Sequence, residues 1–578
     1  MLKKFFEIFL LISLFTNYIS CTNKSIPYLK GKSSWAEKTL KSLSLREKIG
    51  QLFIVAAASN FSQPTEMLAS AMRKCPYNMD PNHVEKMIKE QKVGGLIFLF
   101  KSDPKTQKSF IERYQEKSKL PLIIAQDSEW GLSMRLDADP KQVVRYPRNM
   151  TLGALVDEQL VYDMGYEVGK QCAALGVHIN LAPVVDVNNN PKNPVIHDRS
   201  FGDDPERVSR LAILYAKGLQ DAGVIAFAKH FPGHGDTDVD SHLDLPVIKH
   251  DKTRLNEIEL QPFKKIIQEG IGGIMSAHLS VPAFDSTPNL ASTLSYPIIT
   301  EELKNNLDFH GLVATDGLGM DAIAKHFKPG EIEFKAYLAG NDILLCPLDV
   351  PRAVELIEQA IKNGQLSEED LNQRVLKVLK AKEWAFDKQK NFKKNNEIKS
   401  LDLYLVRKKA YDLQSKLYHN AITLAKNNAN QSFDSFMLKN SHIIQIGTLP
   451  DNRFAETLKN YNCIVHNYSA MLDNKELETC LKNIKEKNKI IIGVCEMNKF
   501  AQQKFGISSN TVSLISKLKE IGKTVTVLIF GTPYSLPYFK AADNLLVAYE
   551  DAPTAQEAMV NILCGQMQAM GKLPVQVI

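Results

Sequence analysis

The sequence predicts an α/β protein in which a (β/α)8, TIM-like barrel is followed by a smaller α/β sandwich domain. Three observations support this prediction. Between residues 45 and 350, eight short apolar runs alternate with amphipathic helical stretches, which is the pattern of a parallel sheet covered by helices. A lysine- and asparagine-rich stretch at 387–400 has no apolar periodicity and is expected to be a linker. A second alternation of strands and helices follows it.

The eight expected barrel strands are short apolar runs, most of them bounded by glycine or proline. They are GQLFIVAA near residue 50, VGGLIFLF from 93, LPLIIAQD from 120, GVHINLAPVVD from 176, GVIAFAKHF from 223, GGIMSAHL from 272, GLVATDG from 311 and NDILLCP from 341. Eight strand-helix units are the number that closes such a barrel. We therefore assign residues 21–386 to the barrel domain.

Ionisable residues stand beside several of these runs. They are Asp127, Asp186, Lys229, His230, His278, Asp316 and Asp342. A (β/α)8 barrel places its active site at the carboxyl ends of its strands. Asp186 and Asp342, taken singly, fit the start of a solvated loop, but repetition at several strand ends indicates a functional site.

The second domain is assigned to residues 401–578. Before it, Ser367 as N-cap and Asp370 three residues later predict a helix that continues through about Trp384. After the linker we expect a long helix near 403–425 and then four strands, HIIQIG, KIIIGVC, TVTVLIFG and NLLVAYE. No glycine-rich phosphate-binding fingerprint follows any of these strands.

Residues 1–20 are expected to be an export signal of the lipoprotein type. Lys3 and Lys4 precede an apolar run that is too short to span a bilayer and ends in the small residue Ser20. YISC resembles the lipobox of bacterial lipoproteins, which implies acylation of Cys21 and membrane anchoring. The expected location is therefore the periplasm or a membrane-anchored position outside the cytoplasm. Plain secretion and an uncleaved anchor are the alternatives.

The composition is that of a soluble globular protein: 44% of the 578 residues are hydrophobic and 24% are charged. A net charge of +6 with scattered lysines argues against a nucleic-acid partner. The seven cysteines after Cys21 are odd in number and lack paired spacing, so we expect buried thiols and no disulfide framework.

The stretch KHFPGHGDTDVDSH, Lys229–His242, is rich enough in histidine and aspartate to suggest a metal site. For zinc, His230 and His234 are four apart, but Pro232 and Gly233 lie between them and make a shared helical face improbable. The sequence contains no HExxH motif either.

Calcium is the second metal to consider, since Asp236, Asp238 and Asp240 occupy positions one, three and five of an EF-hand-like loop. That loop needs glycine at position six and glutamate at position twelve. The sequence has Ser241 and Val247 at these positions. We therefore expect no metal site in this stretch, and no metal or organic cofactor is implied elsewhere.

Asp240 and His242 favour acid-base chemistry. In an extended segment, side chains two residues apart point the same way, so the carboxylate can bind one imidazole nitrogen and leave the other for a substrate. The whole stretch resembles, position for position, the motif of bacterial β-N-acetylglucosaminidases in glycoside hydrolase family 3. The resemblance implies that Asp240 and His242 form the acid/base dyad and that Lys229 and His230 bind sugar hydroxyls.

Further segments resemble the same family in the expected order. QDSEWGLSMRL is similar to a segment whose aspartate and arginine bind sugar, which implies Asp127 and Arg135. Trp130 replaces a family glycine there and is equally suited to stack on a sugar or to pack internally. VVDVNNNPKNPVIHDRSFG is similar to the loop after the fourth strand and implies Arg199 as a substrate contact. His197 and Asp198 beside it are as readily structural.

GLVATDGLGMDAI resembles the nucleophile segment of the family and implies Asp316 as the nucleophile. The apolar run before Asp316 and the glycines after it agree, because glycine lets a substrate approach closely. Asp321 is interpreted as an early-helix charge. The resemblance covers residues 35–385 closely and 401–578 more loosely.

The mechanism that the resemblance implies is retaining glycoside hydrolysis. Asp316 attacks the sugar and His242 protonates the leaving group, then activates water, while Asp240 orients the imidazole. Some members of the family instead take a glutamate from the second domain, for which Glu550 and Glu557 are the alternatives here.

The expected activity is exo-acting removal of terminal β-linked N-acetylglucosamine from peptidoglycan fragments or other amino-sugar glycans. The alternatives within the family are phosphorolysis, because a neutral imidazole repels phosphate less than a carboxylate does, and β-glucosidase activity. A non-catalytic carbohydrate-binding lipoprotein is the alternative from another class.

Overall fold

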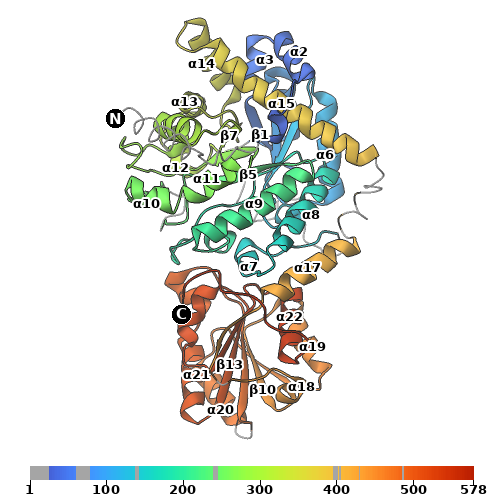
Figure 1. The fold of residues 1–578 in the computed structure, drawn as a ribbon, viewed down its shortest axis with the longest axis vertical. Coiled ribbons are helices and arrows are strands. Elements are labelled where there is room, and N and C mark those ends of the chain that lie inside the picture. Colours follow the sequence, from blue (N-terminus) through green and yellow to red (C-terminus); the bar gives the residue numbers. More distant parts are fainter. Residues whose placement is uncertain are drawn as a thin grey trace, which may run out of the picture.

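The computed structural model describes residues 25–59, 78–136, 142–237, 245–394, 401, 405, 407–428, 430–484 and 487–577, with backbone alone at 392–394. Two bodies are stacked along the long axis of the molecule (Figure 1). The larger one, coloured blue to yellow, holds an eight-stranded sheet, and the smaller one, orange to red, holds a six-stranded sheet. The predicted fold class is confirmed.

All eight predicted barrel strands are present and pair in parallel in the order β7-β6-β5-β4-β3-β2-β1-β8. They are β1 (Phe53–Ala57), β2 (Gly95–Phe98), β3 (Ile123–Gln126), β4 (Ile179–Asn180), β5 (Ile225–Phe231), β6 (Gly273–Ser276), β7 (Leu312–Thr315) and β8 (Leu344–Leu345). A parallel bridge between Ala314 and Ile343 joins β7 to the segment before β8 and brings the ring to closure. Every residue of these eight strands is buried, which explains why the runs are mainly apolar.

The helices of the barrel domain surround this sheet. They are α2 (Ser34–Ser42), α3 (Leu45–Gly50), α5 (Pro81–Lys86), α6 (Pro104–Lys117), α7 (Asn149–Gly153), α8 (Gln159–Leu175), α9 (Pro205–Asp221), α10 (Lys252–Glu257), α11 (Gln261–Gln268), α12 (Asp321–Ala324), α13 (Glu331–Ala339), α14 (Val350–Lys362) and α15 (Glu368–Lys394). Short 3-10 or π-helical segments are η1 (Pro27–Leu29), η2 (Met87–Gln91), η3 (Leu132–Met134), η4 (His197–Arg199), η5 (Ser292–Leu294) and η6 (Pro297–Asn306). Asp103 and Asp204 cap α6 and α9, and each of these helices begins with proline.

The helix after Ser367 is longer than predicted. It was expected to end near Trp384, but α15 continues to Lys394 and includes the first part of the predicted linker. Contacts with the barrel explain the extension: the Phe386 ring stacks on His178 at 4.2 Å, and the Gln389 side chain donates to the Val177 carbonyl at 2.8 Å. Residues 395–400 lie outside the described residues.

The second domain has a sheet of order β11-β10-β12-β13-β14-β9, parallel except for β9. Its strands are β9 (Thr423–Asn427), β10 (Ser441–Ile446), β11 (Val465–Tyr468), β12 (Lys489–Val494), β13 (Thr524–Ile529) and β14 (Asn544–Val547). Its helical segments are α17 (Lys408–Ala421), α18 (Ser435–Lys439), α19 (Arg453–Lys459), α20 (Asn474–Asn483), α21 (Ser509–Glu520), α22 (Pro553–Leu563), η7 (Pro450–Asn452), η8 (Ala501–Gly506) and η9 (Pro533–Phe539). Figure 1 shows α20 and α21 on one side of the sheet and α17, α18, α19 and α22 on the other.

Two strands of this sheet were not predicted. The expected helix near 403–425 ends at Ala421, and β9 then pairs antiparallel with β14. Both β9 and β11 lie at the edges of the sheet and are mostly half-buried, so their sequences TLAKN and VHNY lack a long apolar run.

The two domains are joined by hydrogen bonds at the loops that follow β3 and β4. Tyr534 and Asn188 exchange two hydrogen bonds, of 2.7 and 2.8 Å. The Glu550 carboxylate accepts from the Thr151 hydroxyl at 2.7 Å and from the Arg148 N–H at 2.8 Å. The second domain therefore rests against the carboxyl ends of the barrel strands, where an active site is expected.

The cysteines of the described chain are buried and free: Cys172, Cys346, Cys463, Cys480, Cys495 and Cys564. This agrees with the interpretation as apolar thiols. Cys21 and the predicted signal lie outside the described residues. Among the helices that the structure describes, none is long and apolar enough to cross a membrane.

Candidate active site

Six of the predicted site residues line one cavity of about 280 Å³ at the carboxyl end of the barrel. They are Asp127, Arg135, Arg199, Lys229, His230 and Asp316. The other lining residues are Glu129, Trp130, Met134, Pro194, Val195, His234, Met275 and Lys499. The fold thus brings together side chains that are nearly 200 residues apart in the chain.

Asp316 follows β7 directly and is held from two sides. Its N–H donates to the Ser276 carbonyl of β6 at 3.0 Å. One carboxylate oxygen accepts from the Gly317 N–H at 2.7 Å. His278, beyond the end of β6, contacts the Gly317 carbonyl through Nε2 at 2.9 Å. The carboxylate is therefore set in a fixed orientation at the cavity wall.

A buried ion-pair network forms the floor of the cavity. The Lys229 ammonium lies 2.9 Å from Asp127 and 2.8 Å from Glu129. Asp127 also pairs with Arg135 at 2.5 Å. The Glu129 carboxylate accepts hydrogen bonds from two nitrogens of Arg199, at 2.9 and 2.7 Å. Each of these charges has an opposite partner, which is the condition under which charges are tolerated in a protein interior.

This network fixes the ionisation of its members. Burial alone would raise the pKa of Asp127, but the charges of Lys229 and Arg135 hold it well below its usual value. The pKa of Glu129 is likewise lowered by Arg199 and Lys229 against the effect of burial. Both carboxylates are therefore ionised acceptors at any working pH.

Glu129 was missed by the sequence reasoning. Its side chain is 1% exposed and links Lys229 to Arg199, two residues assigned to sugar binding. One feature of the sequence could have identified Glu129: it stands two residues after Asp127, in the same segment at the end of a strand.

Asp186 was interpreted, taken alone, as the start of a solvated loop, and this is wrong. Its side chain is fully buried and accepts from the N–H groups of His230 at 3.2 Å and His234 at 2.7 Å. Its second oxygen lies 2.7 Å from Nδ1 of His230. Because Nε2 of His230 faces a nitrogen of Arg199 at 3.3 Å, which can only donate, we assign the ring proton to Nδ1.

Asp342, taken alone, was also interpreted as the start of a solvated loop. This is wrong too, because its side chain is buried. It binds Lys304 at 3.2 Å and Lys377 at 2.8 Å and accepts from the Val313 N–H at 2.9 Å. Burial acts to raise its pKa, but the two lysines lower it to about 2. It stabilises the junction of β7 and β8 and does not line the cavity.

Asp240 and His242, the predicted dyad, lie outside the described residues. The described chain on either side is attached to the barrel. Asn193 donates to the His234 and Gly235 carbonyls at 2.8 and 3.0 Å. Beyond the dyad, the Ile248 N–H donates to the Ser280 carbonyl at 2.9 Å.

Burial lowers the pKa of His234 to about 4, so this ring is neutral near pH 7.

Asp236, His250 and Glu259 lie close enough together to share a metal ion. However, Arg254 already binds both oxygens of Glu259, at 2.8 and 2.7 Å, and lies 3.9 Å from Asp236. His250 Nε2 is 2.8 Å from Asp236. A guanidinium among the ligand atoms makes this group an ion-pair network, since arginine keeps its charge.

Trp130, for which two roles were left open, lines the cavity and also carries the Arg148 guanidinium over its ring at 4.7 Å. Arg148 in turn pairs with Asp198.

Glu550 and Glu557, the alternative acid/base residues from the second domain, do not line the cavity that Asp316 lines.

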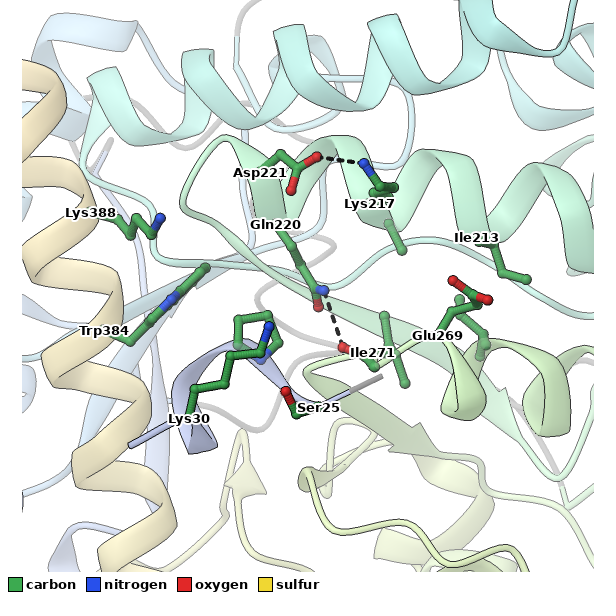
Figure 2. Close-up of a pocket in the computed structure, with 14 residues that line it drawn as sticks. Ser25, Lys30, Ile213, Lys217, Gln220, Asp221, Glu269, Ile271, Trp384 and Lys388 are labelled. Carbon is green, nitrogen blue, oxygen red and sulfur yellow. Dashed lines mark hydrogen bonds and ion pairs between the residues drawn. The ribbon is translucent and has the colours of Figure 1, made fainter. Parts of the chain in front are cut away.

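A second cavity, of about 390 Å³, lies at the opposite end of the barrel, between α9, α15 and the chain before β6 (Figure 2). Its lining includes the apolar residues Ile213, Ile271 and Trp384 beside charged ones. Lys217 and Asp221 pair with each other there at 3.0 Å. The amino-terminal end of a barrel generally serves stability rather than catalysis, so the cavity at Asp316 is the candidate active site.

Several known proteins are similar to this chain in sequence. β-Hexosaminidase A of Pseudoalteromonas piscicida is 35% identical over 332 residues, which cover 52% of this chain and 55% of that protein. The chain thus spans about half the length of that relative. A β-hexosaminidase of Nitrosospira multiformis is 33% identical over 283 residues, 47% of this chain and 78% of that protein.

Among solved structures, a glycoside hydrolase family 3 β-N-acetylglucosaminidase from Paenibacillus sp. str. FPU-7 superimposes with a TM-score of 0.74 at 28% identity. The superposition covers 93% of this chain and 99% of that one, so both domains are shared. The model of the glycosyl hydrolase family 3 N terminal domain matches residues 44–381, more than half of the chain. The family resemblance seen in the sequence is confirmed, and this chain belongs to glycosyl hydrolase family 3.

Proposed function

We propose that this protein is a retaining, exo-acting β-N-acetylglucosaminidase that hydrolyses terminal β-linked N-acetylglucosamine. The observation that carries the proposal is the fixed Asp316 carboxylate in a cavity whose floor is an array of ionised sugar-binding groups. The names of the relatives, β-hexosaminidases and a β-N-acetylglucosaminidase, support the choice of sugar.

In the first step, a carboxylate oxygen of Asp316 forms a bond to the anomeric carbon as the bond from that carbon to the leaving oxygen breaks. His242 gives its proton to the leaving oxygen. In the second step, His242 takes a proton from water, the water oxygen bonds to the anomeric carbon, and Asp316 is released. Asp240 orients His242 and stabilises the imidazolium.

The sugar is held by groups whose charges are set before it binds. Asp127 accepts hydrogen bonds from sugar hydroxyls because its ionised form is strongly favoured. Lys229 and Arg199 donate to the sugar oxygens while their own positions are fixed by Glu129. Such preorganised partners lose little freedom on binding, which favours a defined position of the anomeric carbon beside Asp316.

The natural substrates we propose are peptidoglycan fragments, or other amino-sugar glycans, met outside the cytoplasm. An export signal with an acylated Cys21 would place the enzyme at a membrane surface facing such glycans.

The test uses 4-nitrophenyl β-N-acetylglucosaminide and the matching β-glucoside, each with and without inorganic phosphate. We expect the acetamido substrate to be preferred and free N-acetylglucosamine to be the product, with the β-anomer formed first by NMR. Asp316→Asn should lower kcat on the order of a thousandfold. Preference for the glucoside, full activity in Asp316→Asn, or a sugar 1-phosphate product would refute the proposal.

A further inference from the structure

The first described residues, from Ser25 on, are attached to the amino-terminal end of the barrel. The Tyr28 hydroxyl of η1 donates to the Gly272 carbonyl at 2.6 Å and accepts from the Leu312 N–H at 2.9 Å. Gly272 stands just before β6, and Leu312 is the first residue of β7. Because Asp316 follows the other end of β7, this segment and the candidate active site lie at opposite ends of the strands.

This attachment limits where a group on Cys21 can lie. Cys21 stands four residues before Ser25, and four residues of extended chain span at most about 14 Å. An acyl group on Cys21 would thus enter a membrane close to the amino-terminal end of the barrel. The strands would then separate that membrane from the active site, because the seven residues of β5 alone extend over about 20 Å.

The chain at this end carries an excess of lysine. Between Ser25 and Ser42, the exposed charged side chains are four lysines and one glutamate. Anionic lipid head groups attract lysines that lie close to them, and a basic cluster strengthens the membrane binding of an acylated protein. The five side chains are Lys30, Lys32, Lys38, Lys41 and Glu37.

The cavity of about 390 Å³ belongs to the same end, and we call Ser25–Ser42 together with this cavity the amino-end surface. Lys30 lines the cavity from the amino-terminal segment and Lys388 lines it from α15 (Figure 2). Its acids are Glu269 and Asp221, and Asp221 pairs with Lys217 at 3.0 Å. With three lysines and two acids, the cavity adds to the positive charge of this end.

We propose that the amino-end surface lies on a membrane that contains anionic lipids, so that the active site opens away from the lipid. The proposal rests on the acylation of Cys21 proposed above, and it adds which face of the enzyme meets the membrane. The second domain rests against the carboxyl ends of the strands and is therefore on the side away from the lipid as well.

Energy transfer from tryptophan to a labelled lipid tests this orientation. The chain has three tryptophans: Trp35 on α2, Trp384 in the cavity of the amino-end surface and Trp130 in the cavity at Asp316. Trp35→Phe/Trp130→Phe keeps Trp384 alone, and Trp35→Phe/Trp384→Phe keeps Trp130 alone. Both acylated variants are reconstituted in vesicles of phosphatidylcholine and phosphatidylglycerol with a trace of dansyl-phosphatidylethanolamine.

We expect transfer from Trp384 to exceed transfer from Trp130 by about twofold or more, because the length of the strands lies between the two rings. Equal transfer, or stronger transfer from Trp130, would overturn the proposal. A wild-type N-terminus without an acyl group in mass spectrometry would overturn it too. Wild-type activity on 4-nitrophenyl β-N-acetylglucosaminide in the same vesicles is a separate readout, so an enzyme that is oriented as expected but inactive would refute the proposed function alone.

The lysines are tested in a chain that keeps all three tryptophans, two of which lie at the amino-terminal end. Lys30→Gln/Lys32→Gln should lower the transfer by about half in vesicles with phosphatidylglycerol, and added salt should do the same to the wild type. Lys459→Gln/Lys475→Gln is the matched control, because both lysines are exposed in the second domain. No loss of transfer in the first variant, or an equal loss in the control, would contradict the role given to the amino-end surface.

Discussion

Replacing Glu129 by glutamine removes one negative charge from a buried ion pair while keeping the size of the side chain. The Glu129 side chain is 1% exposed and that of Lys229 is 3% exposed. After the change, Lys229 keeps Asp127 at 2.9 Å, but Arg199 loses both of its carboxylate bonds. The guanidinium would then be a largely buried cation without an anionic partner at that position.

The magnitude follows from these contacts. Removing one partner of a buried ion pair costs about 3–5 kcal/mol. The glutamine carbonyl can still accept one hydrogen bond, which returns about 1 kcal/mol. We therefore expect the free energy of unfolding of Glu129→Gln to fall by about 2–4 kcal/mol. We also expect kcat/KM to fall at least tenfold, because Arg199 and Lys229 lose the group that positions them.

The pH dependence of the free energy of unfolding is an independent test of the role of Glu129. The pKa of Glu129 is held below its usual value of 4.5 by Arg199 and Lys229, although burial acts to raise it. The ionised carboxylate therefore stabilises the fold above that value, and this contribution is lost as the pH falls below it. Between pH 5 and 3, the wild type should lose stability more steeply than Glu129→Gln.

Urea unfolding followed by circular dichroism at several pH values measures both effects. Glu116→Gln is the control, because Glu116 is exposed on α6. An unchanged unfolding midpoint for Glu129→Gln, or parallel pH curves for the wild type and this variant, would refute the role given to the network.

Three further predictions concern other parts of the chain. Burial lowers the pKa of Lys382 to about 7, and its ammonium donates to Gln51 at 2.7 Å, so Lys382→Met should raise the melting temperature. The gain should have its full size below about pH 7 and shrink as the pH rises toward 10, because the lysine then also loses its proton in the unfolded chain. Calorimetry at pH 6 and at pH 10 measures the difference. Glu550→Gln should leave the pH dependence of kcat/KM unchanged. In His242→Ala, the part of this pH dependence that reports the ionisation of the acid/base group should disappear, and added azide should partly restore activity. Cys21→Ser should move the protein from the membrane to the soluble fraction in cell fractionation, and mass spectrometry of the wild-type N-terminus should find an acyl group.

The barrel could be predicted from the sequence because its strands are buried on both faces. A parallel strand of this kind is a largely apolar run between helices, as in Phe53–Ala57, and eight such runs indicate the architecture. The edge strands of the second domain were missed for the opposite reason. Thr423–Asn427 and Val465–Tyr468 are half-buried, so their pairing rather than their composition makes them strands.

The site could be predicted only where a residue stands directly at a strand end or in a motif of the family. Asp316 and Lys229 were predicted in this way, and both line the cavity. Asp186 was misinterpreted because its burial depends on the backbone of His230 and His234, which approaches only in the folded chain. Lys499 could not be predicted as a lining residue of the cavity, because nothing in the sequence around it shows that this part of the second domain lies against the barrel.

The position of Arg199 connects the second domain to the chemistry of the first. Arg199 ends η4, and the two residues before it are each held by other parts of the molecule. His197 contacts Thr532 of the second domain, and Asp198 pairs with Arg148, whose N–H donates to Glu550 of that domain. The orientation of Arg199, which lines the cavity at Asp316, therefore depends on contacts made some 335 residues away. We expect a barrel without its second domain to keep Asp316 in place but to lose the partners of η4. Removal of that domain should therefore change KM more than the reactivity of the proposed nucleophile Asp316.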